Sequence, residues 1–146
     1  MNIQPDFKEL LALLEKHQVE YMLVGGYAVA FHGYPRFTKD IDVYFENTDE
    51  NINKIISALM EFGFSVDELP PDLFKKPGNI ITLGVAPVRV DFLNEIDGVG
   101  FTEAKKQRVR GKYDNVDIYF IGKEDLIKNK RSTPRTKDKV DAEEIS

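Results

Sequence analysis

Residues 21–45, YMLVGGYAVAFHGYPRFTKDIDVYF, decide the fold. The stretch begins with a short apolar run, 21–24, that stops at Gly25-Gly26, which is typical of a buried strand ending in a tight turn. Residues 27–32 then form a segment compact enough for a short helix. Over 40–45, apolar residues alternate with Asp, Asp and Tyr, and this period of two predicts a second strand. We therefore expect strand, turn, helix and strand in succession.

The rest of the chain is a mixture of further helices and strands. Apolar stripes at helical spacing mark the helices, and period-two runs mark the strands. The helices are expected to start at Pro5-Asp6, 47–50, 122–125 and Pro134, with one helical turn between Pro71 and Pro77 and strands at 79–83, 88–93, 108–113 and 116–121. Because helices and strands do not alternate strictly, we predict an α+β fold, built as one domain over 1–146.

Composition excludes several classes of protein. The 146 residues are 42% apolar, so a core can form without a structural metal, and the absence of cysteine excludes disulfides, thiolate nucleophiles and Cys-based zinc sites. No apolar run approaches the roughly 20 residues of a membrane span, and residues 1–6 lack a signal-peptide pattern. We therefore expect a cytoplasmic protein without a membrane partner.

Charge is distributed unevenly along the chain. The formal net charge is −5, which argues against a protein that coats nucleic acid. Residues 104–112 nevertheless carry five basic and no acidic residues, and 128–139 carry six basic and one acidic residue. These stretches could face a polyanion such as RNA, or they could be ordinary solvated surfaces.

Asp40 and Asp42 form the first candidate site. Side chains of a strand alternate between faces, so both carboxylates point to one side, roughly 6–7 Å apart. Carboxylates at this separation repel each other unless a cation lies between them, and Mg²⁺ or Mn²⁺ prefers such oxygen ligands. Gly25-Gly26 exposes backbone N–H groups at a helix start, where phosphate binds well, although tight turns use the same residues.

Asp91 is a third acidic candidate. It is embedded in the apolar strand 88–93, where a carboxylate needs a partner or a metal. Arg89 lies two residues earlier on the same face and could be that partner. The residue types alone leave both interpretations open, a metal ligand and a structural ion pair.

These residues together resemble a known family. Gly25-Gly26, thirteen intervening residues, Asp40-Ile41-Asp42 and a later strand aspartate resemble the minimal nucleotidyltransferase superfamily, which shares the DNA polymerase beta-type palm. The run 36–42, Arg-Phe-Thr-Lys-Asp-Ile-Asp, resembles the AbiEii-type branch and related uncharacterised nucleotidyltransferases. Residues 125–141 are similar to the tail of that branch, with Lys130 on its lysine and Asp138 on its tail-motif aspartate.

The resemblance implies a mixed β-sheet flanked by helices and a metal-dependent transfer of a nucleoside monophosphate from a triphosphate such as ATP. The acceptor could be an RNA, protein or small-molecule hydroxyl, and a toxin of a toxin–antitoxin pair is one candidate. A partner protein or a homodimer is also open, as is an inactive module that binds nucleotide or a partner. The implied residues are Asp40, Asp42 and Asp91 for catalysis and metal (Mg²⁺ or Mn²⁺), and Gly25, Gly26, Arg36, Lys130 and Arg135 for nucleotide, with structural ion pairs as the alternative for both arginines.

Overall fold

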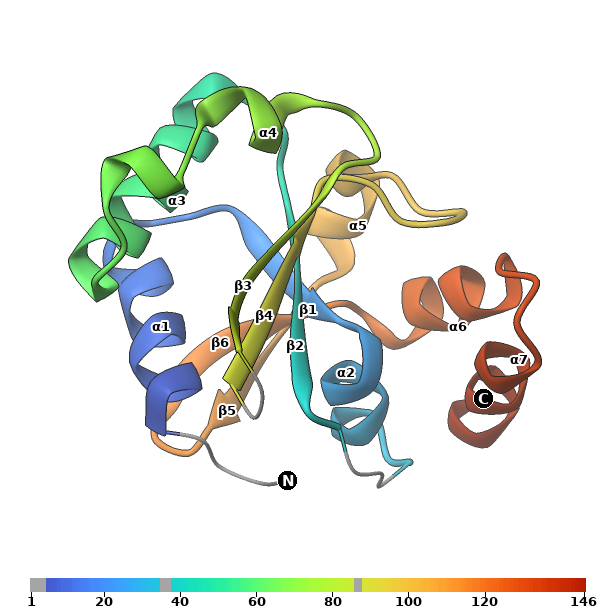
Figure 1. The fold of residues 1–146 in the computed structure, drawn as a ribbon. Coiled ribbons are helices and arrows are strands. Elements are labelled where there is room, and N and C mark those ends of the chain that lie inside the picture. The colour runs from blue at the N-terminus through green and yellow to red at the C-terminus, as the bar shows by residue number, and fades with distance from the viewer. Residues whose placement is uncertain (1–4, 35–37, 86–87) are drawn as a thin grey trace.

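Two strands from the stretch 21–45 form the centre of a six-stranded sheet in the computed structural model, which describes residues 5–34, 38–85 and 88–146 (Figure 1). Strands β1 (Tyr21–Val24) and β2 (Asp40–Phe45) pair antiparallel, as neighbours in the middle of the sheet. The complete order is β3-β4-β2-β1-β6-β5, with β3 at Ile80–Val85, β4 at Val88–Leu93, β5 at Val109–Tyr113 and β6 at Val116–Phe120.

The sheet is mixed. Strands β2 and β4 are parallel, and so are β1 and β6, whereas the edge strands β3 and β5 pair antiparallel with their neighbours. Each edge is therefore a hairpin added to a central pair. Parallel and antiparallel pairs combined with helices on both faces make this an α+β fold, and the prediction of that class is confirmed.

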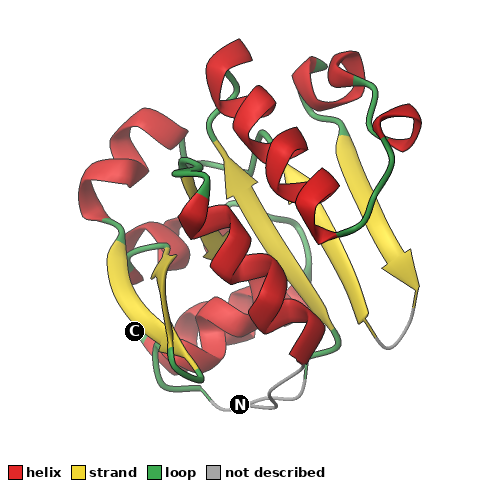
Figure 2. Cartoon of the chain, turned by 90° about the vertical axis from the view of Figure 1, so that its left-hand side faces the viewer, coloured by secondary structure: helices red, strands yellow, loops and turns green. Residues whose placement is uncertain are grey.

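Helices cover the two faces of the sheet unequally (Figures 1 and 2). One face carries α1 (Pro5–Lys16), α3 (Asp49–Phe62) and α4 (Pro71–Lys75), with a short 3₁₀ turn, η1 (Val66–Glu68), between the last two. The apolar residues of β2, Ile41, Val43 and Phe45, are fully buried. Phe45 packs edge-on against Phe74 of α4, 6.1 Å between ring centroids.

The other face carries α2 (Gly25–Phe31), α5 (Phe101–Gln107), α6 (Lys123–Arg131) and α7 (Thr136–Ile145). Tyr44 of β2 packs edge-on against Phe101 of α5, 5.2 Å between ring centroids, and donates its hydroxyl to the Val99 carbonyl at 2.9 Å. Helix α7 packs along α6 rather than on the sheet. The face that holds Asp40 and Asp42 is therefore only partly covered.

Local signals explain most element boundaries. The Thr48 side chain caps α3 by accepting from the Asn51 N–H at 3.2 Å, and Gly63, with φ 135°, ends that helix. Helix α2 begins at Gly25 rather than after the glycine pair as expected. The sequence did not predict α5 or η1, because a seven-residue and a three-residue element are too short to show a period. None of the described helices combines the length and apolar character that a membrane span requires.

Candidate active site

The parallel pairing of β2 and β4 brings the predicted acidic residues together. In its register Asp42 lies opposite Asp91, and Asp40 lies opposite Arg89. The antiparallel pairing of β3 and β4 places Thr82 opposite Asp91 on the other side. Because residues opposite each other share a face, Asp42, Asp91 and Thr82 form one row across the sheet.

Hydrogen bonds and ion pairs tie this row to its neighbours. The carboxyl groups of Asp42 and Asp91 lie close enough for the charge of Asp91 to raise the pKa of Asp42. Thr82 donates its hydroxyl to Asp91 Oδ1 at 2.7 Å. Arg89 Nη2 lies 3.4 Å from Asp40 Oδ2 and 3.5 Å from Asp91 Oδ2. Both interpretations of Asp91 are therefore compatible with the geometry, since it lies beside two carboxylates and also contacts Arg89.

The electrostatics of the row disfavour the charged form of Asp42. Burial raises the pKa of Asp42 to about 7, with the nearby charges of Asp91 and Asp40 adding to the rise and Lys130 opposing it. With a pKa near 7, the Asp42 carboxyl group is about half protonated at neutral pH, and a bound cation would favour its charged form. The row consequently has the properties of a cation site.

The glycine pair closes around the same carboxylate. Gly25 has φ +67°, and a Cβ at this position would collide with Asp42 Oδ2. A Cβ at Gly26 would lie 2.8 Å from the Thr38 hydroxyl oxygen. A side chain is thus disfavoured at both positions, and the backbone of Gly25 lies directly beside Asp42.

A second cluster, which we call the α6–α7 ion cluster, consists of Lys130, Thr133, Arg135, Asp138 and Asp141. Lys130 Nζ lies 2.9 Å from Asp138 Oδ1 and 3.5 Å from Asp141 Oδ2. Thr133 and Arg135 donate to Asp138 Oδ2 at 2.7 and 2.8 Å. Burial alone would raise the pKa of Asp138, but the hydrogen bonds from Lys130, Thr133 and Arg135 lower it overall. The cluster fixes α7 to α6 and holds the Lys130 charge near Asp42.

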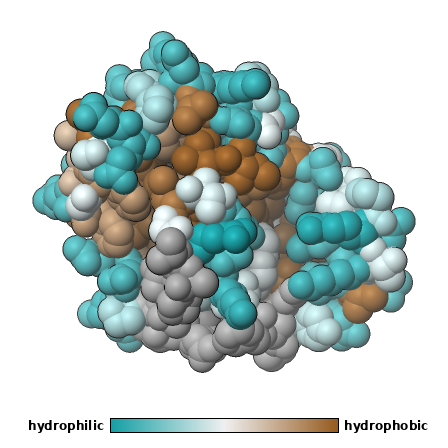
Figure 3. Space-filling model, viewed as in Figure 1, coloured by the Kyte–Doolittle hydropathy of each residue, from teal (hydrophilic) through white to brown (hydrophobic). Residues whose placement is uncertain are grey.

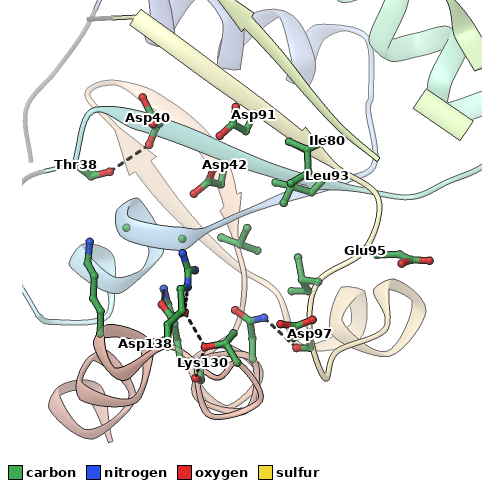
Figure 4. A pocket seen from close by; sticks show the side chains of 18 residues that line it. Thr38, Asp40, Asp42, Ile80, Asp91, Leu93, Glu95, Asp97, Lys130 and Asp138 are labelled. Carbon is green, nitrogen blue, oxygen red and sulfur yellow. Dashed lines mark hydrogen bonds and ion pairs between the residues drawn. The ribbon is translucent and has the colours of Figure 1, made fainter. Parts of the chain in front are cut away.

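One cavity of about 560 Å³ joins the acidic row, the glycine pair and the ion cluster (Figure 4). All predicted site residues in the described ranges line it, namely Gly25, Gly26, Asp40, Asp42, Asp91, Lys130, Arg135 and Asp138. Arg36, predicted to bind nucleotide, lies outside the described residues. Segments from both ends of the chain thus converge on one hollow.

The cavity also contains residues that the sequence did not single out. Among them are Thr38, Ile80, Leu93, Glu95 and Lys137. Thr82, on the neighbouring strand β3, contacts Asp91 through a hydrogen bond. In the sequence, Ile80 and Leu93 show only the apolar character that is usual in strands. The alternation of β4, in which Asp91 and Leu93 share a face, was the available signal, but it does not show which strand lies alongside.

The acidic row fits a hard divalent cation in its chemistry. Asp40, Asp42 and Asp91 offer oxygen donors, which Mg²⁺ and Mn²⁺ prefer. Within the described ranges no three acidic or histidine side chains are already arranged as a metal cage. Arg89, with its side chain 46% exposed, lies between two of the carboxylates and has solvent into which it can turn. The raised pKa of Asp42 and the space left by Gly25 favour a cation at this place.

Comparisons with known proteins agree on the class of fold. A family model described as a nucleotidyltransferase of unknown function (DUF6036) matches residues 2–146. A candidate nucleotidyltransferase from Thermotoga maritima is 17% identical, with a TM-score of 0.60 over 86% of this chain and 83% of that one. The lincosamide antibiotic adenylyltransferase LnuA, solved with lincomycin bound, is 18% identical, with a TM-score of 0.58 over 99% and 98%. No curated protein shows significant sequence similarity.

Proposed function

The chain belongs to the DUF6036 family of nucleotidyltransferases, and from this membership we propose that its cavity moves a nucleoside monophosphate from a nucleoside triphosphate to a hydroxyl acceptor. The observation that carries the proposal is the row of Asp42 and Asp91, with Asp40 beside it, in the cavity that Gly25 and Gly26 also line. An oxygen-rich cation site next to an open backbone suits a metal–triphosphate complex.

The chain's residues divide the chemistry between them. The acceptor oxygen forms a bond to the α-phosphorus, the bond from that phosphorus to the β-phosphate oxygen breaks, and pyrophosphate leaves. Asp91 accepts the proton of the acceptor hydroxyl. Mg²⁺ or Mn²⁺ held by Asp40, Asp42 and Asp91 would neutralise the phosphates and activate the acceptor oxygen. The N–H groups of Gly25 and Gly26 bind phosphate oxygens.

Basic residues supply positive charge for the phosphates of the nucleotide. Lys130 lies close enough to Asp42 to lower the pKa of that carboxyl, so its charge also reaches a phosphate bound there. Arg135, whose side chain is 75% exposed, contacts Asp138 and has donors left for a phosphate. We assign Arg36 to the nucleotide as well, on the sequence resemblance alone.

The finer identity of the enzyme is part of the proposal. LnuA is named an adenylyltransferase, which supports ATP as the first nucleotide to test. Membership of the AbiEii-type branch rests on residues 36–42 and 125–141 and stays a prediction, as does the toxin role. A neighbouring reading frame that encodes an antitoxin would support that role.

The direct experiment is isothermal titration with ATP, CTP, GTP and UTP, each with and without Mg²⁺. We expect one nucleotide to bind in a Mg²⁺-dependent way, and Asp40→Asn to lose the Mg²⁺ dependence. Asp67→Asn, an exposed aspartate on η1, is the matched control and should bind as the wild type does. The proposal fails if no nucleotide binds with Mg²⁺, or if Asp40→Asn binds unchanged.

A further inference from the structure

The edge strand β3 carries one polar side chain, and the sheet register places it beside the acidic row. In the sequence of β3, IITLGV, only Thr82 has a side chain that can donate a hydrogen bond. The pairing of β3 with β4 puts Thr82 opposite Asp91, which is the one acidic residue of β4. The one side-chain donor of the edge strand therefore lies opposite the one carboxylate of its neighbour.

Thr82 fixes one oxygen of the Asp91 carboxylate. Its hydroxyl donates to Asp91 Oδ1 at 2.7 Å. Hydroxyl groups that donate to a carboxylate do so at roughly 2.5–2.7 Å, and such bonds are among the stronger hydrogen bonds of proteins. Threonine is β-branched, which restricts rotation about χ1, so its hydroxyl is held in place on the strand. Asp91 Oδ1 is consequently tied to β3.

The other oxygen of Asp91 faces the remaining carboxylates. Arg89 Nη2 lies 3.5 Å from Asp91 Oδ2 and 3.4 Å from Asp40 Oδ2, so these two oxygens face a common point. Strand β4 lies between β3 and β2, and Asp42 of β2 is opposite Asp91 on the side away from Thr82. In Figure 4 the side chains of Asp40, Asp42 and Asp91 lie near one another. The hydroxyl of Thr82 thus leaves Asp91 Oδ2 to the acidic row.

Apolar side chains flank the pair of Thr82 and Asp91 on one side. Ile80 and Leu93 are the next residues on the same face of the two strands, and they lie opposite each other. Figure 3 shows apolar surface near the middle of the view, where β3 begins in Figure 1. The Asp91 side chain is only 15% exposed, so few water molecules can replace the hydroxyl of Thr82.

We propose that Thr82 is a positioning residue for the acidic row. Its hydroxyl holds Asp91 Oδ1 toward β3 and thereby directs Asp91 Oδ2 toward Asp40 and Asp42. The inference rests on the proposed function, which places a divalent cation at these carboxylates. Thr82 lies outside the set of described residues that line the cavity, so it acts through Asp91 rather than on a ligand. Hydrogen bonds of this kind orient metal-ligating side chains and raise the affinity for the metal.

The experiment compares Thr82→Val, which replaces the hydroxyl by a methyl group, with Thr82→Ser, which keeps the hydroxyl. Isothermal titration measures the affinity for the α,β-methylene analogue of ATP, or of the triphosphate that the first titration selects, in excess Mg²⁺ and in EDTA. We expect the gain in affinity due to Mg²⁺ to be about tenfold smaller in Thr82→Val, which is the effect of losing a hydrogen bond to a metal-ligating side chain. The affinity in EDTA should not change, and Thr82→Ser should restore the gain.

Thr102→Val, at an exposed position of α5 outside the cavity, is the matched control and should keep the wild-type gain. Urea unfolding in EDTA checks that each variant folds, and Thr82→Ala provides the same comparison if valine disturbs the sheet. An unchanged gain in Thr82→Val, an equal loss of affinity in EDTA, or a loss that Thr82→Ser does not reverse would overturn the inference. Absence of nucleotide binding in the wild type would instead overturn the proposed function, so the two failures are distinguishable.

Discussion

At the residue scale, the site depends on contacts that leave no room for change. Gly25 adopts φ +67° directly against the Asp42 carboxylate, and Asp42 in turn lies opposite Asp91, whose charge raises the pKa of Asp42. The first contact requires a residue without a Cβ, and the second places two carboxylates closer than their charges favour. These two contacts therefore lower the stability of the folded protein without ligand, as is common at sites where a bound ligand supplies the missing interaction.

Gly25→Ala should weaken both folding and nucleotide binding. The new methyl group meets the Asp42 carboxylate on a backbone that disfavours a side chain, so we expect a loss of about 1–3 kcal/mol in the free energy of unfolding. Urea denaturation and nucleotide titration measure the two effects. Gly78→Ala is the control, because Gly78 has φ +80° but its nearest contact is Glu95 Oε2 at 3.5 Å. Equal losses in the two variants would show that the Asp42 contact is unimportant.

Asp42→Asn should stabilise the protein while removing its metal-dependent binding. The substitution takes a half-buried carboxylate away from Asp40 and Asp91 and keeps the size of the side chain, so we expect a gain of about 1 kcal/mol in EDTA. Urea unfolding in EDTA measures the gain, and titration with Mg²⁺ and nucleotide measures the loss. A variant that is less stable than the wild type and still binds Mg²⁺–nucleotide would contradict the role of Asp42.

At the element scale, two pairings build the site. The parallel register of β2 and β4 aligns Asp42 with Asp91, and a slip of one residue would turn one of them to the opposite face. The α6–α7 ion cluster then holds the last helix against α6 with Lys130 inside. Removing one member of a buried ion pair leaves an uncompensated charge, so this helix pair is sensitive to single substitutions.

Asp138→Asn tests the cluster through pH. The hydrogen bonds that lower the pKa of Asp138 stabilise the folded protein above the ordinary aspartate pKa near 4, and this contribution is lost as pH falls through the lowered value. We expect the free energy of unfolding of the variant to be about 2–4 kcal/mol lower than that of the wild type at pH 7, and the difference to become smaller as the pH drops below 4. Urea unfolding across pH measures this difference.

Asp117→Asn removes an exposed ion pair with Lys112 and should change stability little at any pH. If the difference in the free energy of unfolding between the wild type and Asp138→Asn stays constant from pH 7 to pH 3, the stabilising role assigned to the Asp138 carboxylate is contradicted.

At the scale of the whole molecule, the cavity collects residues from distant parts of the chain. The glycine pair, the strands β2 and β4 and the helices α6 and α7 all contribute to it. A ligand bound there contacts the centre of the sheet and the C-terminal helices together. Its binding free energy therefore adds to the stability of the whole fold rather than to one element.

Nucleotide with Mg²⁺ should raise the melting temperature of the entire protein in one transition. At a ligand concentration about a hundred times its Kd the gain is about 2.7 kcal/mol, or roughly 5–10 °C for a chain of this size. Scanning calorimetry measures it, with nucleotide alone and Mg²⁺ alone as controls. A shift of equal size without Mg²⁺ would contradict a metal-dependent site.

The sequence by itself determined the elements other than α5 and η1, and it indicated which residues form the candidate site. The period-two run over 40–45 places Asp40 and Asp42 on one face, the glycine pair ends β1, and the α+β class follows from the mixture of patterns. These features are local, because they depend on spacing along the chain and on the preferences of each side chain. The comparisons confirm the class of enzyme that the motifs suggested, and the roles of the individual residues stay predictions.

Only the tertiary structure decided which residues meet. The pairing of β4 beside β2, the partners of the basic stretch 104–112, the burial of Lys130 and the apolar row of Ile80 and Leu93 all join segments far apart in the sequence. Charge and hydrophobicity read along the chain cannot reveal such partners, since Coulombic and packing energies depend on distance in space. The charge of the basic stretch 104–112, which suggested a polyanion in the sequence, is therefore cancelled by ion pairs in the fold.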